Sequence, residues 1–129
     1  MCIRDSYRNV LIDIYDFLEK KINQCEKNNI DRSRIIIDPG IGFGKNLKQN
    51  LNLIKNISLF HSLGVSILLG SSRKTFISKI SKNALENERL GGSISSVIYA
   101  LNQGVQIFRV HDVIETKQAL DVYNKIKRA

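Results

Sequence analysis

The segment DPGIGFGK at residues 38–45 limits the possible folds of this chain more than any other stretch, and it directly follows the apolar run of residues 35–37. A short β-branched run that ends in Asp-Pro-Gly is typical of a buried strand stopping at a turn. The three glycines that follow let the backbone turn sharply and approach a ligand closely. Asp38 is therefore expected at the carboxyl end of a strand, where α/β folds keep their binding residues. The alternative is that Asp38 only closes the strand with an Asx turn.

Helical and strand-like patterns alternate along the chain. Apolar residues spaced three and four apart predict helices at about residues 7–28, 47–63, 74–82, 93–103 and 113–127. Short apolar runs predict strands at residues 35–37, 65–69 and 106–110. Strands that alternate with helices of this length indicate parallel βαβ units, so the expected class is α/β. No linker divides the chain, and 129 residues correspond to about one domain.

The helix ends carry further signals. Asn46 is expected to cap the helix that begins at residue 47. Asp112 with Glu115 three residues later is typical of a capping box at the start of the last helix. His61, near the end of the second helix, is expected to face solvent. The last helix is expected to contact the core through Val113, Leu120 and Ile126.

The chain is basic, with 20 Lys and Arg residues against 12 Asp and Glu residues and a formal charge of +8. This balance fits a nucleic acid, an anionic small molecule, or only solubility. Aromatic residues are few and do not alternate with the basic residues, which argues against a stacking platform for single strands. The sequence contains no arginine-rich run and no zinc-ligand spacing.

The two cysteines, Cys2 and Cys25, form no paired motif, which fits a reducing compartment. No apolar run reaches the ~18 residues that span a bilayer. Residues 1–6 lack the apolar core of a signal peptide and resemble a translated adapter sequence. We therefore expect residues 1–6 to be a non-native leader and the protein to be cytoplasmic.

Polar residues follow each of the three predicted strands. In a parallel sheet the strand ends share one edge, so these residues are expected to converge: Asp38 and Phe43, then Ser72, Arg73, Lys74 and Thr75, then Arg109 and His111.

These groups suit a ligand with two different ends. Arg109 offers a guanidinium fork for phosphate oxygens, and the following helix start adds N–H donors. Asp38 offers two acceptor oxygens that can bridge the N–H groups of a heterocycle. The expected ligand is a nitrogen ring that bears a phosphate. For Arg109 and His111 the alternative is an ion pair with Asp112 or Glu115. Arg73 fits either a ligand contact or a structural ion pair. Glu88 and Arg89 are expected to form a structural salt bridge or to anchor a loop.

Four blocks of sequence resemble the dihydropteroate synthase family, in that family's order and at reasonable spacing. They are residues 37–45, residues 70–74 (GSSRK), residues 88–93 (ERLGGS) and residues 109–113 (RVHDV). The resemblance implies a (β/α)8 barrel, of which residues 7–129 would supply one helix and the last three β/α units. The chain would then be a fragment of the pterin-binding domain, inactive alone, with two unpaired strand edges and an uncovered apolar face.

The family joins 4-aminobenzoate to 6-hydroxymethyl-7,8-dihydropterin diphosphate and releases diphosphate in folate biosynthesis. The resemblance implies that Asp38 binds the pterin and that Lys74, near Ser72 and Arg73, contacts it. Phe43 and Thr75 would contact the aminobenzoate. The diphosphate would be held by Arg109, Val110 and His111. Asp38 and Lys74 would be the catalytic residues.

The resemblance also implies a magnesium ion whose ligand lies outside this chain, so no metal ligand is expected here, and a homodimer for the full-length enzyme. Two rival interpretations remain. One is a fragment that binds anions or nucleic acid without catalysis. The other is a pterin-binding methyltransferase barrel, in which the diphosphate contacts of the blocks at 70–74 and 109–113 would have no use.

Overall fold

The computed structural model describes residues 7–129, so the expected leader at residues 1–6 lies outside the described part. The helices are α1 (Val10–Lys27), α2 (Leu47–Lys55), α3 (Thr75–Ile80), α4 (Leu90–Asn102) and α5 (Val113–Arg128). The strands are β1 (Ile36–Ile37), β2 (Ser66–Leu69) and β3 (Ile107–Phe108). Short 3-10 helices lie at Arg32–Arg34, Ile57–Leu63 and Glu86–Glu88.

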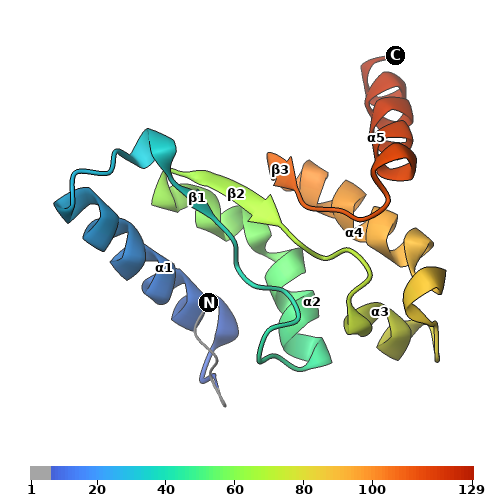
Figure 1. The fold of residues 1–129 in the computed structure, drawn as a ribbon, viewed down its shortest axis with the longest axis horizontal. Coiled ribbons are helices and arrows are strands. Elements are labelled where there is room, and N and C mark those ends of the chain that lie inside the picture. The colour runs from blue at the N-terminus through green and yellow to red at the C-terminus, as the bar shows by residue number, and fades with distance from the viewer. Residues whose placement is uncertain (1–6) are drawn as a thin grey trace.

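The three strands form one parallel sheet in the order β1-β2-β3, which confirms the expected α/β class. Ile37 pairs with Ile67, and Leu69 pairs with Phe108. Helix α1 packs against α2, α2 against α4, and α4 against α5. In Figure 1, α2 and α4 lie behind the sheet, whereas α5 reaches away from it. Because both pairings are parallel, all three strands run in one direction and end at the same edge of the sheet.

The core lies between the helices and one face of the sheet. It is formed by apolar side chains of all these layers, among them Ile14, Leu18, Ile37, Leu53, Phe60, Ile67, Leu69 and Ala100. Along β1 the side chains alternate, because Ile37 is buried while Ile36 is 55% exposed. Within residues 7–129, no element covers Ile36 on the opposite face of the sheet.

Two predicted helices end earlier in the structure by two residues or more. The helix expected at residues 47–63 ends at Lys55 and continues after Asn56 as a 3-10 helix. The Asn56 side chain donates to both the backbone and the side-chain oxygen of Asn52, and such local bonds compete with the regular helix. The helix expected at residues 74–82 ends at Ile80. No helix within residues 7–129 is both long and apolar enough to cross a bilayer.

The predicted core contacts of α5 are wrong for two of three residues. Val113 and Ile126 are exposed, and only Leu120 is half-buried. The cause is the position of α5, which packs against α4 and projects beyond the sheet. His61 also differs from expectation, because it is half-buried and its Nε2 lies 2.8 Å from the Gln103 carbonyl oxygen.

The two glycines at the start of α4 provide a packing test. A Cβ added at Gly92 would lie 2.5 Å from Cγ2 of Ile77, whereas one added at Gly91 would meet nothing within 4 Å. We expect Gly92→Ala to lower the free energy of unfolding by about 1–3 kcal/mol through overpacking. Gly91→Ala should raise it by at most about 1 kcal/mol through helix propensity. Urea unfolding of both variants in a full-length version of the protein measures this difference, and equal effects would contradict the packing of Gly92 on Ile77.

The uncovered apolar side chains predict self-association of the 129-residue chain. Ile36 on the sheet and Ile114 on α5 are 55% and 81% exposed, and both outer strands have an unpaired edge within the described residues. We expect aggregation or oligomers in analytical ultracentrifugation, in amounts that rise with concentration. A monomer with a sharp, concentration-independent melting transition would show that this expectation is wrong.

Candidate active site

Asp38 lies directly after β1 and points toward the end of β2. Its Oδ1 accepts a hydrogen bond of 2.8 Å from the Gly40 N–H, which is an Asx turn. Its Oδ2 lies on the side of Gly70, where an added Cβ would be 3.9 Å away. The Asx turn is compatible with a binding role for Asp38. The turn uses Oδ1, and Oδ2 of the exposed carboxylate remains as an acceptor for a ligand.

The loop after Asp38 needs its glycines. Gly40, Gly42 and Gly44 have φ angles of +78°, +87° and +63°, in the left-handed region that side chains disfavour. The Gly42 N–H donates to Oδ1 of Asn50, a residue of α2 that is only 4% exposed. Sequence reasoning missed Asn50, although an Asn on the apolar face of a predicted helix is a signal of a buried hydrogen bond.

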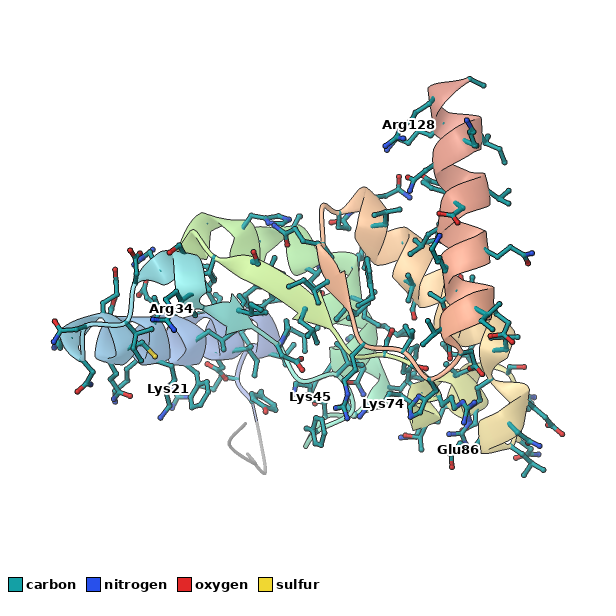
Figure 2. All side chains as sticks on the ribbon, turned by 45° about the horizontal axis from the view of Figure 1, so that its top comes forward. Lys21, Arg34, Lys45, Lys74, Glu86 and Arg128 are labelled. Carbon is teal, nitrogen blue, oxygen red and sulfur yellow. The ribbon has the colours of Figure 1, made fainter. Side chains whose placement is uncertain are left out.

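Lys74 and Phe43 meet across this loop. The Lys74 ammonium lies 4.2 Å from the centroid of the Phe43 ring, within the range of a cation–π contact. A Cβ on Gly42 would lie 3.1 Å from Cδ of Lys74, so the lysine stem runs along the loop. Figure 2 shows Lys74 and Lys45 at the same end of the sheet. The ends of β1 and β2 thus bring together a carboxylate, an exposed aromatic ring and a cation.

The end of β3 is bonded to the end of β2. The Arg109 N–H donates to the Leu69 carbonyl oxygen at 3.0 Å. The His111 N–H donates to Oγ of Ser72 at 3.2 Å, and His111 Nδ1 lies 2.9 Å from the same oxygen. The side chains of Arg109 and His111 remain exposed at this edge. Thr75 begins α3 and is also exposed, whereas Val110 is half-buried.

Arg73 forms the structural ion pair that the sequence left as one of two possibilities. Its Nη2 and Nε donate to the two carboxylate oxygens of Asp112 at 2.8 and 3.3 Å. The hydrogen bond from Arg73 lowers the pKa of Asp112, and the same bond raises the pKa of Arg73. Because Asp112 is engaged by Arg73, its side chain does not cap α5, and the predicted capping box with Glu115 is not formed.

Arg89 anchors the same loop, as expected. Its Nη1 donates to the Arg73 carbonyl oxygen at 2.8 Å, and its Nε donates to the Ala84 carbonyl oxygen at 3.0 Å. The Arg73 N–H donates to Oγ of Ser93 at 2.8 Å. These bonds hold Arg73 at a φ of +56°, which is uncommon for a residue other than glycine. The backbone that presents Lys74 is therefore fixed from both sides.

Lys45 is a second residue that sequence reasoning did not assign. Its Nζ donates to the carbonyl oxygens of Gly40 and Phe43. Burial lowers the pKa of Lys45, and the nearby Asp38 carboxylate opposes this shift. Residues 7–129 contain no group of three or more His, Cys, Asp or Glu residues that could hold a metal ion.

Comparison with known proteins gives a consistent family. A family model described as "Pterin binding enzyme" matches residues 2–111. Dihydropteroate synthase of Escherichia coli strain K12 is 38% identical over 116 residues, which cover 90% of this chain and 41% of that protein. Haemophilus influenzae dihydropteroate synthase is 35% identical over 123 residues, which are 95% of this chain and 44% of that protein.

A solved structure agrees with these sequence matches. Dihydropteroate synthase from Xanthomonas albilineans in complex with 7,8-dihydropteroate superposes with a TM-score of 0.95 at 34% identity. That match covers all of this chain and 50% of the solved chain. The chain thus spans about half the length of the relatives it matches. Both the sequence and the fold place it in the pterin-binding enzyme family.

Proposed function

We propose that this chain is the C-terminal part of a dihydropteroate synthase. The observation that carries the proposal is the meeting of Asp38, the Phe43–Lys74 pair and the exposed Arg109 and His111 at one edge of the sheet. The curated relatives cited above are dihydropteroate synthases. Two solved structures of the Xanthomonas albilineans enzyme contain 7,8-dihydropteroate and 4-aminobenzoic acid, respectively.

The finer fold is part of the same proposal. We infer that residues 7–129 contribute one helix and the last three β/α units of a (β/α)8 barrel. The exposed Ile36 face would then line the barrel interior, and the outer edges of β1 and β3 would pair with strands that this chain does not supply. The isolated chain would be inactive, because half of the site is contributed from elsewhere.

The proposed roles follow from charge and position. The Asp38 carboxylate would accept hydrogen bonds from the pterin ring and stabilise the positive charge that develops as diphosphate leaves. Arg109 and His111, with the Val110 backbone, would hold the departing diphosphate. The neutral arylamine then attacks the exocyclic carbon of the pterin and loses a proton, so no strong general base is needed.

The aminobenzoate would lie beside Phe43 and Lys74. Phe43 would pack against its ring, Lys74 would contact both the pterin and this pocket, and Thr75 would lie near the carboxylate. Ser72 would support His111, to which it is already hydrogen-bonded. Arg73 is committed to Asp112, so we assign it to holding the loop rather than to direct contact with a substrate.

Magnesium and assembly remain predictions. The described residues offer no cluster of metal ligands, so they do not fit a magnesium site by themselves, and we expect the ligand from the part of the barrel outside this chain. When bound, the ion would supply positive charge to the diphosphate. We likewise expect a homodimer for the full-length enzyme, a cytoplasmic location and no nucleic-acid partner.

Three substitutions in a full-length version of the enzyme test the site. We expect Asp38→Ala, Lys74→Ala and Arg109→Ala each to lower the rate of dihydropteroate formation at least ~100-fold, the scale for lost transition-state contacts. Lys79→Ala, at an exposed position of α3, is the matched control and should retain activity. The condensation of pterin diphosphate with labelled 4-aminobenzoate provides the measurement.

Near-normal turnover in the three variants would remove the site assignment. Salt-dependent DNA binding by the protein without any pterin binding would instead favour the alternative of a non-catalytic anion-binding fragment.

A further inference from the structure

The side chain of Lys45 folds back onto the loop that it ends. Its Nζ donates to the Gly40 carbonyl oxygen at 2.7 Å and to the Phe43 carbonyl oxygen at 2.8 Å. The Phe43 N–H donates to the same Gly40 oxygen at 3.1 Å, which closes a tight turn. One ammonium group thus joins the first and last carbonyls of the turn that presents Phe43.

The surroundings of Lys45 favour a fixed position over a free surface cation. The side chain is half-buried, and its ammonium lies 5.7 Å from the centroid of the Tyr7 ring. A partly buried ammonium is costly unless its donors are used, and here two of them bind loop carbonyls. The loop itself is rich in glycine and therefore gains little rigidity from its own backbone.

Ile41, which is 1% exposed, anchors the loop in the core, and two hydrogen-bonding side chains hold the backbone around it. Asn50 of α2 accepts from the Gly42 N–H, while Lys45 donates to carbonyls on either side of that residue. Phe43 itself is 54% exposed, so packing against the core does not fix its ring. What places the ring beside Lys74 is therefore the conformation of the loop backbone.

We propose that Lys45 is a positioning residue for the aminobenzoate pocket. It holds residues 40–44 in the conformation that keeps the Phe43 ring next to Lys74. This inference rests on the proposed function, in which Phe43 packs against 4-aminobenzoate. Asp38 emerges directly from β1 and is followed by the buried Pro39, so loss of Lys45 affects aminobenzoate binding more than the chemical step.

The kinetic test uses Lys45→Met in the full-length enzyme, because methionine keeps an unbranched apolar stem and removes the donors. We expect the KM for 4-aminobenzoate to rise about tenfold, the scale for one lost charge-assisted hydrogen bond, while kcat changes less than about threefold. The matched control is Lys48→Met, three residues along the chain at an exposed position of α2, which should leave both values unchanged.

The second measurement needs no substrate. Hydrogen exchange at the Gly42 and Phe43 amides, both bonded in the structure, should become faster in Lys45→Met and not in Lys48→Met. If Lys45→Met does not fold, Lys45→Gln, which keeps a neutral donor, replaces it in both assays.

The outcomes distinguish a failure of the Lys45 proposal from a failure of the proposed synthase function. Unchanged exchange at these amides overturns the role of Lys45, whether or not the enzyme is active. Faster exchange with an unchanged KM also overturns it, because the loop would then move without consequence for binding. An unmodified full-length protein without synthase activity overturns the proposed function, and the exchange result still shows whether Lys45 holds the loop.

Discussion

The parallel pairing of β2 with both of its neighbours is the constraint on which the site depends. Ile37 pairs with Ile67 and Leu69 with Phe108, so β2 and β3 end level and β1 ends two residues before them. The hydrogen bond from the Arg109 N–H to the Leu69 carbonyl extends this alignment one residue past β3. A shift of one residue in either pairing would turn the following side chains to the other face of the sheet. Residues distant in sequence share one edge because the ladder sets their register.

Pairing of the strands fixes where the loops begin, and polar side chains fix where they go. Asn50 holds the glycine loop, Ser72 holds the start of the segment at His111, and Arg89 holds the carbonyl of Arg73. Each of these bonds satisfies a polar group of the backbone or of a side-chain ring. Each bond also restrains the loop that carries this group. Together with the burial of Ile41 in the core, these bonds give the loops the rigidity that binding sites need for preorganised contacts.

The sequence predicted those features that local chemistry decides. Apolar runs ended by Asp38-Pro39 or by Gly70 located the strand ends, and the alternation of strands and helices then implied convergence at one edge. It left open whether Arg73 forms an ion pair and did not identify Asp112 as the partner, because the two residues are far apart in sequence and Asp112 satisfies the local rule for a capping box equally well. Nor did spacing reveal that α5 projects beyond the sheet, because an apolar stripe does not say whether its partner lies in the same chain.

The ion pair that the sequence left open also shapes the electrostatics of the edge. Arg73 is bound through two nitrogens to Asp112, so most of its charge is compensated within the protein. Among the described residues, neither Lys74 nor Arg109 forms an ion pair with a carboxylate. An anion that reaches the end of β3 thus meets Arg109, whereas Asp38 after β1, on the other side of β2, presents a negative group. Under the proposed function, this separation of Asp38 from Arg109 would suit a ligand with hydrogen-bond donors on a ring at one end and a diphosphate at the other. Arg73 adds little to the field at this edge, because Asp112 of the same fold already compensates its charge.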